Sequence, residues 1–195
     1  MALAALGLAS LAGCTGGSGP ILTETPSPIA TARPTPSASP SPSPTPLTDA
    51  ELLALMPPEA AYPDVRGAIA TAQFFLEEYQ RLFFTGNDAV WAALSVEGCE
   101  FCSSSRRGAV ALRDEGARQE GGEFTIDPST IEANFYDETG FTYVILHATW
   151  TPTQNVYSDG RIEPDGDGGA AKISFEMELQ GDAWRVRGVG VEATA

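Results

Sequence analysis

Two cysteines separated by two residues, in the segment Cys99-Glu100-Phe101-Cys102, have a spacing that could do chemistry. Such a pair can be a redox centre, part of a metal site or a structural disulfide. Thioredoxin-like redox chemistry places the pair after a strand in a β-α-β unit, whereas here two predicted helices precede it. The choice among the three chemistries then depends on the remaining cysteine and on the compartment.

The remaining cysteine, Cys14, follows a short apolar stretch that is too short to span a bilayer as a helix. The segment Leu11-Ala12-Gly13-Cys14 resembles the lipobox of bacterial lipoprotein signal peptides. That resemblance implies that residues 1–14 are a signal segment and that Cys14 is acylated. We therefore expect the protein to be anchored in the lipid bilayer, on the extracytoplasmic face of the cell membrane.

An acylated Cys14 leaves two cysteines and one histidine, His147, which is short of a closed four-ligand zinc site. In an oxidising compartment the pair Cys99 and Cys102 most simply forms a disulfide. Closing so short a loop contributes about 2 kcal/mol by the chain-entropy estimate. We expect a structural disulfide, no metal and no cofactor. A redox role would require a pair that is exposed and readily reduced.

The composition divides the chain into three parts. Residues 15–59 are rich in Pro, Ser and Thr, carry little that could be buried, and are predicted to be a disordered, extended linker. Residues 60–195 are left for one domain of ordinary size. The formal net charge of −15 argues against nucleic acid as a partner, because phosphates require a basic surface.

Helices are predicted at the start of the domain. Apolar side chains recur at helical spacing over 67–86, and Gly86 is expected to end this helix in a left-handed cap. Shorter helices are predicted over 89–95 and over 103–119. A capped helix over 47–56, stopped by two prolines, is expected to pack on the domain as an N-terminal arm.

Strands are predicted in the second half of the domain. Residues 141–150 are apolar on both faces, which is typical of a central strand covered on both sides. Residues 131–136 and 173–180 alternate, as half-buried strands do. In the last strand the apolar phase changes at Gly188, which indicates a β-bulge. Three helices followed by about four antiparallel strands predict an α+β fold with a curved sheet over the helices.

An acidic, glycine-rich segment separates two of the strands. In residues 159–169, Asp165 and Asp167 partly imitate a calcium-binding loop, with Glu176 at the twelfth position. Gly169 and Ala170 break that pattern. We therefore interpret the segment as the solvated tip of a hairpin.

The order of elements resembles the cone-shaped superfamily of nuclear transport factor 2, ketosteroid isomerase and scytalone dehydratase. The lipobox, the Pro-rich linker, the helix with Phe74, Phe75 and Tyr79, and the segment Cys99–Cys102 resemble a family of uncharacterised actinobacterial lipoproteins. The first resemblance implies a cone of three helices packed into a curved antiparallel sheet. The second implies almost nothing about activity.

Enzymes of the cone superfamily use Asp or His groups that face into the cone. The single histidine, His147, shares a strand face with Tyr143, so both residues are candidates for lining a pocket. Asp137 or Glu176 could then act as the partner of His147 in acid–base chemistry. The alternative is a lone histidine that is hydrogen-bonded within the sheet.

These observations favour a binding or interaction module over an enzyme. We expect a small apolar ligand in the cone or a protein partner in the cell envelope. The alternative is an isomerase- or dehydratase-like enzyme that uses His147 and a carboxylate. No motif in the sequence assigns a catalytic residue.

Overall fold

The computed structural model describes residues 46–194 of the 195-residue chain. The signal segment with Cys14, and the linker as far as residue 45, lie outside the described residues. The helical elements are α1 (Asp49–Leu53), a 3-10 turn (Pro58–Ala61), α2 (Val65–Thr85), α3 (Ala89–Leu94) and α4 (Glu100–Asp114). The strands are β1 (Ala117–Gly121), β2 (Phe124–Tyr136), β3 (Phe141–Trp150), β4 (Thr153–Tyr157), β5 (Ile162–Gly166), β6 (Gly169–Gln180) and β7 (Ala183–Ala193).

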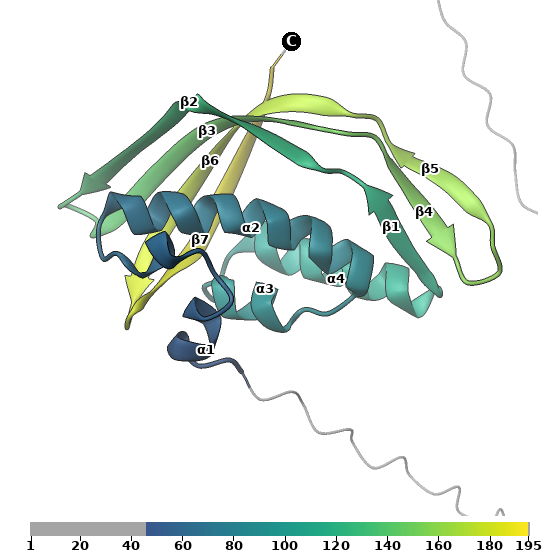
Figure 1. Cartoon of the computed structure of the whole chain (residues 1–195), viewed down its shortest axis with the longest axis horizontal. Coiled ribbons are helices and arrows are strands. Elements are labelled where there is room, and N and C mark those ends of the chain that lie inside the picture. Colours follow the sequence, from purple (N-terminus) through teal and green to yellow (C-terminus); the bar gives the residue numbers. More distant parts are fainter. Residues whose placement is uncertain (1–45, 195) are drawn as a thin grey trace, which may run out of the picture. The chain divides into compact units, whose positions relative to one another are not determined.

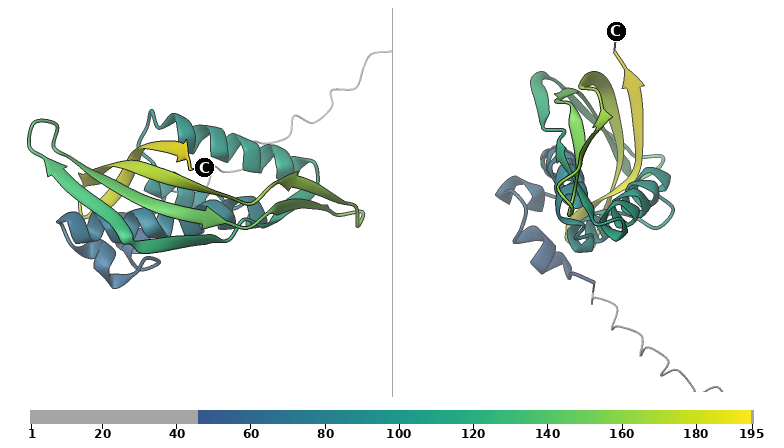
Figure 2. Two further views of the ribbon diagram at one scale, coloured as in Figure 1. Left: turned by 90° about the horizontal axis from the view of Figure 1, so that it is seen from above. Right: turned by 90° about the vertical axis from the view of Figure 1, so that its right-hand side faces the viewer.

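The fold class is α+β, as the sequence predicted. Four antiparallel strands form a curved sheet in the order β2-β3-β6-β7, and the helices lie together on its concave side (Figures 1 and 2). Strands β1, β4 and β5 form a second antiparallel sheet in that order. The sequence pattern does not predict these three short strands as a separate group.

Helix α2 runs along the concave side of the large sheet (Figure 1). It begins two residues before the predicted start, because Asp64 is its N-cap and accepts a hydrogen bond from the backbone N–H of Arg66. It ends where predicted, at Gly86, whose φ of 67° gives the left-handed C-cap. The face with Ala68, Ala72 and Phe75 is buried.

Helix α4 differs from its prediction at both ends. It begins at Glu100, inside the cysteine pair, with Cys99 as its N-cap. It ends at Asp114 rather than near Gln119, because Gly116 takes a left-handed φ of 73° and the chain continues as β1. The third predicted helix is therefore confirmed in its existence and wrong in its last turn.

The folded part begins before the expected boundary at residue 60. Thr48 and Glu51 form a reciprocal capping box at the start of α1, and Leu52 is fully buried. Asp49 pairs with Arg185 of β7 at 2.5 Å and accepts a hydrogen bond from the backbone N–H of Asp182 at 3.1 Å. The predicted arm helix therefore packs on the domain.

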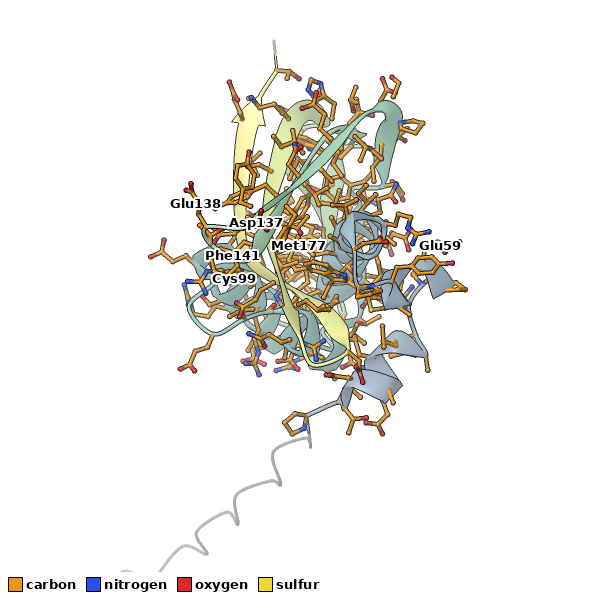
Figure 3. All side chains as sticks on the ribbon, turned by 90° about the vertical axis from the view of Figure 1, so that its left-hand side faces the viewer. Glu59, Cys99, Asp137, Glu138, Phe141 and Met177 are labelled. Atoms are coloured by element: carbon orange, nitrogen blue, oxygen red, sulfur yellow. A yellow bond between two sulfur atoms is a disulfide. The ribbon has the colours of Figure 1, made fainter. Side chains whose placement is uncertain are left out.

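The large sheet is covered on one face only. Its concave face buries Val144, Leu146, Phe175 and Met177 against the helices, and Figure 3 shows Met177 in this interior. On the opposite face of β3, Phe141, Tyr143 and Ile145 are only half buried. The prediction that both faces of β3 are covered is wrong, because every helix of the described domain lies on the concave side.

The β-bulge predicted near Gly188 is present. Glu176 of β6 pairs with Gly188 of β7, but the next residue of β6, Met177, pairs with Val186. Arg187 is therefore the extra residue. Its guanidinium lies 3.1 Å from the carboxylate of Glu176 and 3.4 Å from that of Glu178. The bulge keeps the apolar residues on both sides of it facing the core.

The two sheets meet at a corner, where the chain passes from one sheet to the other three times. Strand β1 leads into β2, β3 into β4, and β5 into β6, with breaks at Gly121–Gly122, Pro152 and Gly168. A Cβ atom at Gly121 would lie 2.1 Å from the carbonyl oxygen of Pro152, and one at Gly168 would lie 2.8 Å from that of Trp150. Glycine at these positions lets the backbones approach closely enough to turn the corner.

Candidate ligand cavity at the corner of the sheet

The candidate pocket residues Tyr143 and His147 lie on the outer face of the sheet. His147 is exposed and Tyr143 is half exposed, where it makes an edge contact with Tyr136 at 5.2 Å between ring centroids. Neither lines the two hollows described below. The prediction that Tyr143 and His147 line a pocket is therefore wrong. Both faces of β3 are apolar, so its sequence does not show which face the helices cover.

The expected carboxylate partners do not stand opposite His147. Its neighbours across the strands are Asp127 of β2 and Lys172 of β6. Glu176 pairs instead with Tyr143, four residues away along the strand. Asp137 lies in the turn after β2, labelled in Figure 3. The arrangement proposed for an enzyme with His147 in the cone is therefore absent from the described residues.

The cysteine pair forms the expected disulfide. Cys99 and Cys102 are joined and are each 3% exposed, at the first turn of α4. The backbone N–H of Cys102 donates to Cys99 Sγ at 3.2 Å, and Trp91 Nε1 donates to the carbonyl oxygen of Cys102 at 2.9 Å. The burial of both sulfur atoms favours a structural role, in which the disulfide fixes the turn that carries Phe101.

A cavity of about 320 Å³ lies inside the corner, between α2, the first turn of α4 and the concave face of the sheet. Aromatic and aliphatic side chains make up most of its wall. They are Leu76, Tyr79, Phe101, Phe124, Trp150, Ile173, Val189 and Val191. A mostly apolar cavity of this size with a few polar groups is the usual form of a small-molecule site.

The four aromatic rings in the wall form a continuous chain of contacts. The ring of Tyr79 lies 5.8 Å from that of Phe101 and 6.1 Å from that of Phe124, measured between centroids. Phe124 in turn lies 6.1 Å from Trp150. These contacts hold the rings in place, so the wall is largely preformed before any ligand enters.

Polar groups gather at the end of the cavity formed by the small sheet. The carboxylate of Asp165 accepts hydrogen bonds from Gln119 Nε2 at 2.7 Å, Asn155 Nδ2 at 3.1 Å and Thr153 Oγ1 at 3.3 Å. Because these donors come from β1 and β4, the three strands of the small sheet together fix the position of one carboxylate. Asp167 also lines this end.

Tyr79 connects the apolar wall to the polar end. Burial raises the pKa of its hydroxyl, and the negative charge of Asp165 raises that pKa further. Tyr79 therefore keeps its proton at neutral pH and can donate a hydrogen bond. No described residue accepts one from it in this structure.

A larger hollow of about 810 Å³ adjoins the cavity. Gln80, Gln119 and Thr153 line both spaces. Three glutamates (Glu77, Glu120 and Glu123) and one cation, Arg81, contribute to its lining. Charged and amide side chains of the larger hollow therefore border the polar end of the cavity.

Two of the main cavity residues lie in segments that the sequence makes recognisable. Tyr79 belongs to the predicted helix over 67–86 and Phe101 lies between the two cysteines, but neither position indicates a cavity. Phe124 and Trp150 could have been suspected from their position beside Gly122 and Pro152, since strand breaks often accompany a corner. The sequence marks Asp165 only as part of the acidic segment 159–169, because Gln119, Thr153 and Asn155 meet it only in the folded sheet.

The acidic segment 159–169 is partly a hairpin tip, as expected. The turn after Tyr157 contains Gly160 with a φ of 88°, but residues 162–166 continue as strand β5. Asp165 therefore belongs to a sheet rather than to a calcium loop. Among the described residues, no cluster of three or more Cys, His, Asp or Glu side chains is placed to hold a metal ion.

Within residues 46–194, none of the helices combines the length and the apolar character needed to cross a bilayer.

Comparison with known proteins gives structural likenesses only. No known family and no curated protein matches the sequence. The intermembrane-space region of the chloroplast protein ARC6 aligns at 12% identity and a TM-score of 0.46, over 68% of this chain and 99% of that one. An uncharacterised cystatin-like protein from Caulobacter vibrioides aligns at 12% identity and a TM-score of 0.40, over 66% and 91%. A cystatin-like protein from Nostoc punctiforme aligns at 12% identity and a TM-score of 0.35, over 77% and 96%. Each is a general likeness of fold, and none transfers a function to this chain.

Proposed function

We propose that this protein is a bacterial envelope lipoprotein whose domain binds a small amphiphilic molecule without transforming it. The carrying observation is the cavity of about 320 Å³, with its wall of four aromatic rings and its carboxylate-containing end. Apolar walls supply affinity for a ligand body, and a few polar groups at one end orient it. The single histidine lies outside this cavity, so the alternative of an enzyme that uses His147 there has no support.

The lipoprotein part of the proposal rests on Cys14 and on the Pro-rich residues that follow it. Acylation of Cys14 would hold the chain at the membrane, and an extended linker would carry the domain away from the lipid surface. The Cys99–Cys102 disulfide agrees with an oxidising compartment. In a bacterial host, a Cys14→Ser variant should move from the membrane fraction to the soluble fraction. Retention of that variant in the membrane contradicts the anchor.

The binding part is tested by native mass spectrometry of the full chain carrying Cys14→Ser, exported through an oxidising compartment. We expect a discrete extra mass that disappears when the protein is denatured, together with the two-hydrogen deficit of the disulfide. A Trp150→Ala variant should lose the extra mass, whereas Tyr143→Ala, on the outer face, should keep it. Equal retention in both variants places the ligand elsewhere and contradicts the proposal.

A further inference from the structure

The charges that line the cavity are all of one sign. Asp165 and Asp167 are its charged residues, and no Arg, Lys or His lines it. The donors to Asp165 are two amides and a hydroxyl, which orient the carboxylate but bring no positive charge. Neither aspartate forms an ion pair within the described residues. The negative charge at this end is therefore not neutralised by the protein.

The surroundings of the cavity do not reverse this sign. Three glutamates line the adjoining hollow, of which Glu120 pairs with Arg118 at 2.5 Å, and the one cation in the lining is Arg81. That cation already lies 3.0 Å from the carboxylate of Glu78, on the helix itself. A ligand head at the mouth of the cavity thus meets an excess of carboxylates.

The aromatic wall favours the same kind of ligand. The faces of Tyr, Trp and Phe rings attract cations, and the attraction grows when the cation is removed from water. Tyr79 and Trp150 line the same cavity as Asp165. A cationic head can therefore contact a carboxylate and a ring face together. An anionic head would face Asp165 and Asp167 with no positive charge in the lining to compensate them.

We propose that the cavity selects ligands with an ammonium head on an apolar body and rejects anionic amphiphiles such as fatty acids and phosphate or sulfate esters. The inference rests on the proposed function and names the ligand class for the same site. Asp165 and Asp167 select the charge of the head, and the rings around Tyr79 hold the body. Discrimination comes as much from repulsion of anions as from attraction of cations.

The test compares three probes with one apolar body and different heads: phenylbutylammonium, phenylbutanol and phenylbutyrate. Binding is measured by isothermal titration calorimetry on the full chain carrying Cys14→Ser, at physiological ionic strength. We expect the ammonium to bind about tenfold more tightly than the alcohol, and we expect no detectable binding of the carboxylate. Higher salt should weaken the binding of the ammonium and leave the affinity for the alcohol unchanged.

Variants identify the source of the selectivity. The side chain of Asp167 makes no hydrogen bond within the described residues, so Asp167→Asn breaks none. This variant should therefore fold normally and bind the ammonium several-fold more weakly. Asp165→Asn should have a larger effect. In each variant the loss of affinity should be larger for the ammonium than for phenylbutanol, which carries no charge. The matched control is Asp137→Asn, which removes the same charge from the turn between β2 and β3 (Figure 3) and should leave all three affinities unchanged.

The outcomes separate the two proposals. Equal binding of the ammonium and the alcohol, or tighter binding of the carboxylate, overturns the charge selection while the binding function stands. Failure of all three probes to bind contradicts the binding function and this inference with it. An equal loss of ammonium affinity in Asp137→Asn and Asp167→Asn assigns the preference to the overall charge of the protein and also overturns the inference.

Discussion

The two halves of helix α2 face different interiors. At Phe75 the interior is closed: its ring stacks on Trp91 at 4.2 Å and meets the edge of Phe175 at 5.9 Å, and all three side chains are at most 1% exposed. One turn later, at Tyr79, the same helix borders the cavity. One continuous helix therefore serves both a packed core and a binding site.

The difference comes from the strands opposite the helix rather than from the helix itself. Opposite Phe75 the strands β3, β6 and β7 continue unbroken, and α3 and the disulfide-bonded turn of α4 complete the core. Opposite Tyr79 the strands break at Gly121–Gly122, Pro152 and Gly168 and turn away. Stability and binding are therefore separated along one helix, and four predictions test this separation.

The largest expected effect is in the closed half. Phe75→Ala removes a fully buried ring and should lower the free energy of unfolding by about 4 kcal/mol. Phe124→Ala, in the open half, should cost only about 1–2 kcal/mol, because that ring is half buried and borders a cavity. Urea unfolding followed by tryptophan fluorescence measures both. Equal losses would show that the two halves are not packed differently.

The next effect concerns the arm that covers one edge of the closed half. Asp49→Asn removes the charge that neutralises Arg185. Burial lowers the pKa of Arg185, and the carboxylate of Asp49 opposes that change. We expect a loss of about 2 kcal/mol, below the value for a fully buried pair because Asp49 is partly exposed. Asp182→Asn, an exposed change nearby, is the control and should be neutral in the same unfolding assay. A neutral Asp49→Asn would mean that α1 does not hold the closed half.

The third prediction concerns the disulfide that fixes the first turn of α4. Reducing Cys99–Cys102 should lower the free energy of unfolding by about 2 kcal/mol, since a four-residue loop constrains the unfolded chain only slightly. Parallel unfolding curves with and without dithiothreitol give the difference. The Cys99→Ser/Cys102→Ser double variant should match the reduced protein and no longer respond to the reductant. A response that persists in the double variant would assign the effect to something other than this bond.

The smallest expected effect is a pH dependence from Glu78 of α2, which is 3% exposed. Burial raises its pKa, Arg81 opposes that change, and Glu77 adds to it. A carboxyl whose pKa is higher in the folded state binds its proton more tightly there. The protein therefore loses stability as the pH rises above the pKa that the carboxyl has in the unfolded chain. Glu78→Gln should therefore stabilise the protein at pH 7 by about 1 kcal/mol or less and have no effect well below pH 4.

The control for that titration is Glu59→Gln, at an exposed site (Figure 3). It should be neutral at both pH values. If Glu78→Gln instead destabilises the protein at neutral pH, the ion pair with Arg81 outweighs the burial of the carboxyl, and the charged Glu78 stabilises the folded state.

Local patterns in the sequence determined the elements that repeat a clear period or a cap. Helix α2 follows from its apolar spacing and from Gly86, and β6 follows from the alternation of Ile173, Phe175 and Met177. The bulge at Arg187–Gly188 follows from the phase change in β7. The α+β class follows from the order of these elements. Such features depend on contacts within a few residues, so the sequence displays them directly.

The tertiary structure alone decided which face of β3 is inside, where the small sheet forms and where the cavity lies. Both faces of β3 carry apolar side chains, and only the position of the helices puts Val144 inside and His147 outside. Strands β1, β4 and β5 lack an apolar period, so their own sequences do not mark them as strands. Pairing with one another holds them in a sheet. Asp165 meets Gln119 across 46 residues. The cavity is a space left between distant segments, and no local pattern encodes such a space.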